Sequence, residues 1–219
     1  MASRTTQERV RQMTDPASTA VLTMELQKGI VAGEALFPAL VEEVERVHLL
    51  DSVRRICDGA REAGARVVHC TRVGRSDGAG QSLNCKVFVM GEKLRRERGG
   101  DVLEEGGRGA ELVEGLADPA DIVVSRMHGM TPFTSTSLDQ ILRNLGVRTV
   151  VATGVSVNIG VFGMVLSAVD LGYEVVLPRD GVAGVPADYA QTVIDQALSL
   201  LATVTTSDEL LGVWGESRS

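Results

Sequence analysis

Six short, mainly apolar runs, separated by longer stretches rich in polar residues, constrain the fold of this chain most. The runs are Thr19–Met24, Arg66–Cys70, Ile122–Ser125, Thr149–Thr153, Glu174–Leu177 and Ala202–Thr205. A strand that is apolar along its length, rather than alternating, is buried on both faces. Because helix-length stretches separate the runs, we expect right-handed crossovers. The pattern predicts a three-layer, doubly wound α/β fold with a mainly parallel sheet of about six strands.

The stretches between the runs have the spacing of amphipathic helices. Apolar residues recur at intervals of three and four over Phe37–Ala63, and Gly64 follows where a helix C-terminus favours glycine. We therefore expect one long helix over this range. Further helices are expected near Ser137–Leu145, Asn158–Leu171 and Tyr189–Leu201.

Length and composition favour a single domain. The chain has 219 residues, which suits one α/β domain over residues 1–219 better than two. Hydrophobic residues make up 44% of the sequence and aromatic residues only 3%, so the core must be built from aliphatic side chains and methionine.

Charge, hydropathy and cysteine content together favour a cytoplasmic protein that binds neither nucleic acid nor a membrane. The net charge of −7 argues against a nucleic-acid partner. The N-terminal segment lacks the apolar run of a signal peptide, and no run approaches the roughly 18 apolar residues of a membrane span. Cys57, Cys70 and Cys85 show no metal-binding spacing and suit a reducing compartment. We expect no membrane partner.

One segment, Arg72–Gly109, does not fit the alternation of strands and helices. It holds two patches rich in glycine and charge, GRSDGAGQS and RGGDVLEEGGRG, around the more apolar KVFVMGEKL. Connections of this length are usually functional or mobile. We interpret the segment as a lid or an oligomer contact, and a disordered surface insertion is the alternative.

Ligands of doubly wound sheets bind at the carboxyl ends of the strands. The positions that follow the predicted strands include Glu25, Arg126 and, one turn into the helix after the fourth strand, Gly160; the others are Thr71–Arg72, Gly154–Val155 and Arg179–Asp180. A carboxylate facing a guanidinium near a helix N-terminus is an acid/base and anion site in outline. A strand-end carboxylate is at least as often a helix cap or part of a surface ion pair.

Over roughly residues 18–206 the chain resembles the isochorismatase-like, or cysteine hydrolase, superfamily. The resemblance is carried by AVLTMELQ, VVSRMHGMTPFTSTSLDQILRNLGVRTVVATGVSVNIGV and LGYEVVLPRDGVAG. It implies a hydrolase with an Asp base, a Lys and a Cys nucleophile. This sequence has Glu25, Arg126 and Gly160 at those three positions. Without a thiol at position 160, the covalent amidase route lacks its nucleophile.

The isochorismatase branch of the family is similar at the last position, where glycine replaces cysteine and a vinyl ether is hydrolysed without a covalent intermediate. By this resemblance, Glu25 is the acid or base, Arg126 an anion clamp and Gly160 the open floor of the pocket. The Val155–Ser156 peptide is expected to be cis, with nearby N–H groups facing the ligand.

Two function classes follow from these residues. The first is a hydrolase of a small, carboxylate-bearing molecule that uses non-covalent acid/base catalysis. The second is a catalytically degenerate binding or scaffold protein that keeps the fold and the pocket, which the three replacements also fit. A thiol hydrolase using Cys70 is a third option, although cysteine is usually an inert core residue.

Several other candidate residues each have two possible roles. Phe37 and Phe133 are expected in the pocket wall, with core packing as the alternative. His128 is either a second pocket residue or a loop histidine, whereas His69 is expected in the core and His48 on the surface. LQKGIVAGEALF, which follows Glu25, contains no histidine, so we predict no metal and no cofactor. The resemblance implies a homo-oligomer, either a dimer or a tetramer.

Overall fold

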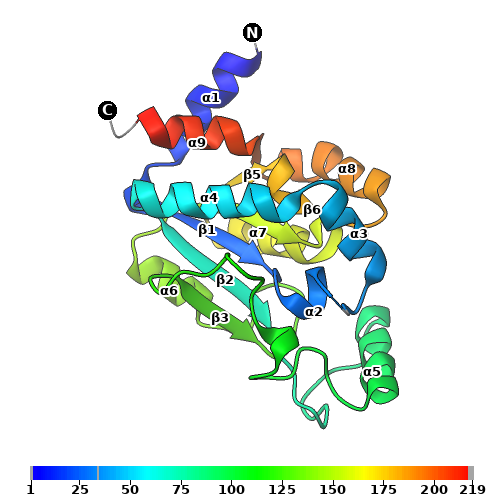
Figure 1. Ribbon diagram of the computed structural model, residues 1–219. Helices are drawn as coiled ribbons and strands as arrows, with labels where there is room; N and C mark the ends of the chain where they lie inside the picture. The colour runs from blue at the N-terminus through cyan, green and yellow to red at the C-terminus, as the bar shows by residue number, and fades with distance from the viewer. Residues whose placement is uncertain (1, 34, 217–219) are drawn as a thin grey trace.

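The computed structural model describes residues 2–33 and 35–216 and shows a parallel sheet between two layers of helices (Figure 1). The strands are β1 (Thr19–Met24), β2 (Arg66–Arg72), β3 (Ile122–Arg126), β4 (Thr149–Val155), β5 (Glu174–Pro178), β6 (Val182–Ala183) and β7 (Thr203–Thr205). Six form the order β3-β2-β1-β4-β5-β7, and β6 pairs with β4. The pairings among these seven strands are parallel. The predicted α/β class is confirmed; β6 is a two-residue strand, too short to give a sequence pattern.

The α-helices fall on both faces of the sheet. They are α1 (Ala2–Met13), α2 (Lys28–Val31), α3 (Pro38–Arg46), α4 (Leu49–Ala63), α5 (Lys86–Arg98), α6 (Leu138–Asn144), α7 (Phe162–Asp170), α8 (Ala187–Gln196) and α9 (Ser207–Glu216). The described part of the chain has no helix that is both long and apolar enough to cross a membrane.

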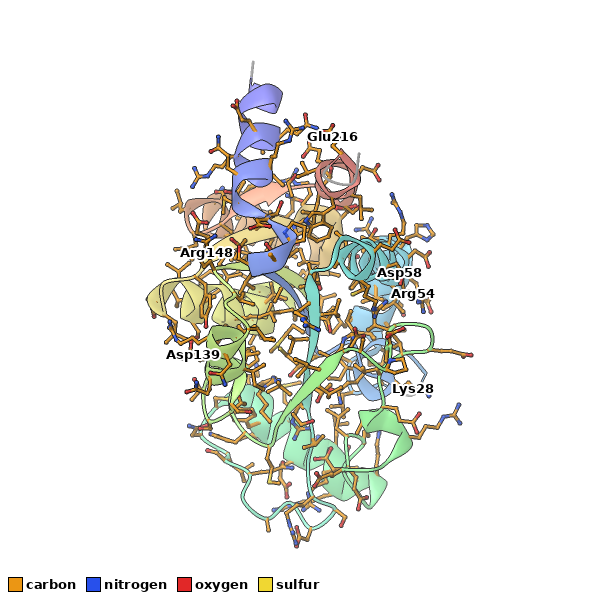
Figure 2. All side chains as sticks on the ribbon, turned by 90° about the vertical axis from the view of Figure 1, so that its left-hand side faces the viewer. Lys28, Arg54, Asp58, Asp139, Arg148 and Glu216 are labelled. Carbon is orange, nitrogen blue, oxygen red and sulfur yellow. The ribbon has the colours of Figure 1, made fainter. Side chains whose placement is uncertain are left out.

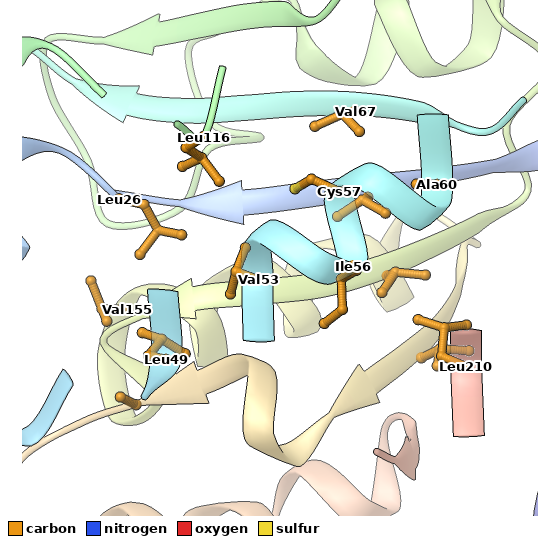
Figure 3. Close-up of a cluster of buried hydrophobic side chains, with 14 of the residues drawn as sticks. Leu26, Leu49, Val53, Ile56, Cys57, Ala60, Val67, Leu116, Val155 and Leu210 are labelled. Atoms are coloured by element: carbon orange, nitrogen blue, oxygen red, sulfur yellow. The ribbon is translucent and has the colours of Figure 1, made fainter. Parts of the chain in front are cut away.

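Alternate residues of one strand serve two separate cores, which explains why the strand sequences are apolar throughout. In β1, Val21 belongs to a core that includes residues of α4 and α9, while Leu22 belongs to a second core that includes residues of α6, α7 and α8. Figure 3 shows the first core, where α4 presents a row of apolar side chains to Val67 and Val155 of the strands and to Leu210 of α9. The opposite side of α4 is charged, with Arg54 and Asp58 pointing outward (Figure 2).

The single long helix predicted over Phe37–Ala63 is wrong, because the chain forms α3 and α4 there. The break lies at Val47 and His48, and His48 has a left-handed backbone with φ 52°. The apolar spacing continues across the break because both helices pack on the same core, so periodicity alone does not reveal the turn. His48 is exposed, as predicted.

Helices α1 and α9 were not predicted from the sequence, and they pack on each other at one end of the molecule (Figure 1). Trp214 of α9 is fully buried, and its indole N–H donates to the Thr14 carbonyl at 3.0 Å. Val10 of α1 is also fully buried, and Arg11 forms an exposed ion pair with Glu216. These terminal segments therefore complete the first core.

The Arg72–Gly109 segment is ordered rather than a structureless insertion. Its middle forms α5, which lies beyond the carboxyl ends of the strands in Figure 1 and has no buried residue. Glu92 pairs with Arg95 and Arg96 along the helix. The segment thus places a helix beside the region where the strand-end residues gather.

His69 lies in the core, as predicted, within a buried polar chain. Its Nδ1 is 2.7 Å from the Thr23 hydroxyl and its Nε2 is 2.9 Å from Oδ2 of Asp121. A carboxylate only accepts hydrogen bonds, so Nε2 carries the proton and Nδ1 accepts from Thr23. Burial lowers the pKa of His69, although the hydrogen bond to Asp121 opposes this shift. Arg61, which also binds Asp121, adds to the lowering.

This burial predicts a specific acid dependence of stability. In the unfolded chain His69 takes up a proton near pH 6.5, whereas the folded pKa is lower. Its contribution is therefore complete above about pH 6.5 and is lost as the pH falls toward the folded pKa, with a slope of up to about 1.4 kcal/mol per pH unit. Urea unfolding between about pH 7.5 and 5.5 should show this slope. His69→Gln should flatten it, while His48→Gln at an exposed site should not; equal slopes in all three proteins would contradict the prediction.

Candidate active site

Glu25, Arg126 and Gly160 line one cavity at the carboxyl ends of the strands, with a volume of about 140 Å³. Glu25 directly follows β1, Arg126 ends β3, and Gly160 lies in a π-helical turn, Val157–Val161, after β4. Parallel pairing brings these strand ends together, although Glu25 and Arg126 are 101 positions apart in the sequence. The positions at the carboxyl ends of the strands, where doubly wound sheets bind ligands, therefore include residues that line a cavity.

An ion pair between Glu25 and Arg126 is the centre of this cavity. Nη2 of Arg126 donates to Oε1 of Glu25, and the two side chains are 3% and 19% exposed, respectively. Oε2 of Glu25 has no hydrogen-bond partner among the residues that the structure describes. Glu25 also has a left-handed backbone with φ 54°, a conformation that occurs disproportionately at functional sites in non-glycine residues. One carboxylate oxygen is therefore held, and the other is available to a ligand or water.

The guanidinium of Arg126 already donates hydrogen bonds to three protein oxygens, which leaves few donors for a substrate anion. Its Nε donates to the Gly129 carbonyl at 3.1 Å and its Nη1 to the Thr71 carbonyl at 3.4 Å, in addition to the contact with Glu25. A guanidinium has five donors, so three of its N–H groups are occupied by protein oxygens. The geometry supports a role in positioning Glu25 rather than the expected clamp on the substrate.

Less free space lies beside Gly160 than the sequence analysis predicted. A Cβ at this position would lie 2.9 Å from Cε of Met24 and 3.2 Å from the Val155 carbonyl oxygen. Met24 is fully buried, so its thioether fills the space beside Gly160. The expectation of an open floor is therefore corrected: glycine here makes room for Met24.

The remaining predicted residues divide between the cavity and its surroundings. Ser156 and Phe37 line the cavity, and the Val155–Ser156 peptide is cis, as the resemblance implied. Val155 is fully buried in the core. Phe133 lies outside the lining and packs with Tyr173, with ring centroids 6.0 Å apart. His128 is exposed and lies outside the lining, with its ring 5.5 Å from that of Phe88.

Several lining residues were not singled out from the sequence. Among the described residues, the lining is made of Glu25, Ile30, Leu36, Phe37, Leu40, Arg72, Gln81, Val87, Phe88, Gly91, Leu103, Arg126, Gly129, Met130, Ser156, Ile159 and Gly160. Arg72, which ends β2, is an exception, because it is one of the strand-end positions that the sequence predicts. Gln81, Val87 and Phe88 come from the Arg72–Gly109 segment, and no local pattern distinguishes them from its other residues.

The cysteines are poorly placed for nucleophilic chemistry. None of them lines the cavity, and burial raises the pKa of Cys70 and that of Cys57 to about 12 each. A thiol with such a pKa is almost entirely protonated near neutrality, and the thiolate is the nucleophile. Cys85 precedes α5. Within the described ranges, no group of three or more His, Cys, Asp or Glu residues could hold a metal ion.

Comparison with known proteins identifies the family to which the chain belongs. Residues 19–209 match the model of the isochorismatase domain. The ureidoacrylate amidohydrolase RutB of Pseudomonas savastanoi pv. phaseolicola is 27% identical over 184 residues, 80% of this chain and 75% of that protein.

Solved structures have the same fold. A cysteine hydrolase from Pseudomonas syringae pv. phaseolicola superposes with a TM-score of 0.76 at 20% identity, covering 92% of this chain and 94% of that one. N-carbamoylsarcosine amidase from Thermoplasma acidophilum superposes with a TM-score of 0.67 at 21% identity, covering 87% and 97%.

Proposed function

This chain belongs to the isochorismatase family of hydrolases, and from that membership we propose that it hydrolyses a small, carboxylate-bearing molecule without a covalent intermediate. The observation that carries the proposal is the state of Glu25. Arg126 holds one of its oxygens, and the other oxygen has no partner among the described residues of the cavity that Glu25 lines. A positioned carboxylate of this kind is suited to general acid–base catalysis.

The proposed reaction moves one proton through Glu25. For an ester or amide, a water molecule gives a proton to Oε2 of Glu25 as its oxygen bonds to the carbonyl carbon, and the carbonyl oxygen takes up the electron pair until the leaving group departs. The bond to the leaving group then breaks, and the leaving group takes its electron pair and the proton from Glu25. Arg126 stays protonated throughout, because guanidinium does not release its proton in proteins. Glu25 is regenerated, and the net change is the addition of water across one bond.

The second candidate is a binding or scaffold protein, and one observation favours it. Gly160 lines the cavity, but the end of the Met24 side chain occupies the space beside it, where other members of the superfamily are expected to carry a cysteine side chain. A binder would hold small acids in the cavity without changing them. The two candidates differ in whether any bond of a bound molecule is broken.

A mixed panel of vinyl ethers, amides and esters, each bearing a carboxylate, tests the proposal. We expect the purified protein to hydrolyse at least one compound, as detected by mass spectrometry. The variant with Cys57, Cys70 and Cys85 all replaced by Ala should hydrolyse it at a similar rate, because none of these thiols lines the cavity. Calorimetric binding of panel compounds with no hydrolysis would instead establish the binder. Loss of activity in a folded Cys70→Ala variant would restore the thiol mechanism.

A further inference from the structure

Two arginines line the cavity, and their positive charges are not equally available. Arg126 is paired with Glu25 inside the cavity and also donates to two backbone carbonyls. A substrate carboxylate that approached Arg126 would meet the negative charge of Glu25, which repels it. The other arginine, Arg72, faces a carboxylate at a greater distance, because its guanidinium nitrogens lie 3.5 and 3.4 Å from the oxygens of Asp101.

The backbone of Arg72 is fixed at the end of β2 by a two-point contact with Gln27. The Arg72 N–H donates to Oε1 of Gln27 at 2.8 Å, and Nε2 of Gln27 donates to the Arg72 carbonyl at 2.8 Å. Gln27 is fully buried, so this contact is shielded from water. A cation on a fixed backbone loses less conformational freedom when it binds a ligand.

The guanidinium of Arg72 is only loosely paired within the protein. Its nitrogens lie 3.5 and 3.4 Å from the two oxygens of Asp101. Both oxygens have closer partners, the Leu103 N–H and Nε2 of Gln81, each at 2.9 Å. A strong charge-assisted contact measures about 2.7–2.9 Å, so the contact with Asp101 is weak. Arg72, whose side chain is 21% exposed, therefore retains charge and donors for an anion.

Two sides of the cavity are formed by apolar side chains, although Gln81 and Ser156 also line it. Phe37 directly precedes α3, Leu40 lies in its first turn, and Val87 and Phe88 lie in α5. These side chains offer no hydrogen bonds to replace those that a polar ligand group gives up to water. The cavity therefore combines one available cation with walls that favour an apolar ligand body.

We propose that the substrates of this site are carboxylic acids with a hydrocarbon body, an aryl or cyclic group, whose carboxylate binds Arg72. The hydrocarbon lies against α3 and α5, and Gln81 keeps Asp101 engaged so that Arg72 faces the ligand. The proposal rests on the proposed function in taking this cavity as the substrate site, and it names the class of substrate.

Calorimetric titration of the full chain with three probes tests this specificity. Phenylacetate has the charge and the apolar body, phenylacetamide lacks the charge, and N-carbamoylglycine has the charge on a polar body. We expect phenylacetate to bind at least about tenfold more tightly than either of the others, since it alone satisfies both the cation and the walls.

Three variants assign the binding to Arg72. Arg72→Gln should weaken phenylacetate binding by roughly 10- to 100-fold, as the loss of a charge-assisted contact implies. The control Arg179→Gln removes a surface guanidinium that pairs with Asp195 outside the cavity, and should leave binding unchanged. Asp101→Asn removes the competing negative charge and should tighten binding, an effect that a purely structural role of Arg72 does not produce. Circular dichroism checks that each variant is folded.

The outcomes separate this inference from the proposed function. Binding that depends on Arg72 supports the inference even if no panel compound is hydrolysed. Equal phenylacetate affinity in Arg72→Gln and the wild type overturns it, as does N-carbamoylglycine binding as tightly as phenylacetate. Failure of the wild-type protein to bind phenylacetate also overturns it, whether or not the protein hydrolyses another compound.

Discussion

Replacement of Glu25 by Gln is expected to lower turnover of the first substrate found by about 10²–10⁴-fold, the usual size of a general acid–base contribution. The amide keeps the shape of the side chain and still accepts a hydrogen bond from Arg126, but it cannot take up and return a proton. Substrate affinity should change little, because Arg72 rather than Glu25 is the proposed partner of the substrate carboxylate. Steady-state kinetics together with direct binding measurements would check both parts.

Two further variants make this result specific. Glu25→Asp keeps an exchangeable proton on a side chain one methylene shorter and should retain more activity than Glu25→Gln. Glu111→Gln removes an exposed carboxylate that pairs with Lys28 outside the cavity, and should leave turnover unchanged. If Glu25→Gln turned over at the wild-type rate, Glu25 would not carry the proton, and the chemistry would have to lie elsewhere.

Trp214→Ala is expected to lower the free energy of unfolding by about 3–5 kcal/mol, the largest stability effect that we predict. The side chain is fully buried in the first core, and its indole N–H donates to the Thr14 carbonyl. Truncation would leave a cavity between α9 and α4, and it would remove the hydrogen bond to the carbonyl of Thr14, the residue that follows α1. Urea unfolding, followed by circular dichroism, gives the difference in free energy from the shift in midpoint.

The matched control is Leu200→Ala, because Leu200 is 82% exposed. Its effect should stay within about 0.5 kcal/mol, as is usual for surface positions. A loss below about 1 kcal/mol for Trp214→Ala would mean that α9 is not part of the cooperatively folded unit, contrary to the packing described here.

The strands and their order of appearance were predictable because burial on both faces leaves a continuous apolar run in the sequence. Thr19–Met24 was predicted with the same bounds that β1 has in the structure. The break between α3 and α4 was not predictable, because both helices face one core and the spacing continues through His48. Helix α1 was missed because, over the part of it whose burial the structure describes, only Val10 and Met13 are buried.

The site was partly predictable for a topological reason. Glu25 and Arg126 follow strands of one parallel sheet, so their convergence follows from the fold class alone. Their mutual ion pair, which changes the role of Arg126, depends on side-chain distances that sequence does not encode. The packing of Met24 beside Gly160 and the approach of Phe88 from α5 likewise depend on tertiary structure.

The central claim, that water attacks the substrate directly with the help of Glu25, is tested by one single-turnover measurement. The protein, in excess over substrate, is allowed to react in water enriched in oxygen-18, and both the product and the peptide containing Glu25 are weighed by mass spectrometry. We predict that the product carries the label after the first turnover and that Glu25 remains unlabelled. Oxygen-18 in the carboxylate of Glu25 would show that a covalent ester or anhydride had formed there and been hydrolysed, which would contradict the claim.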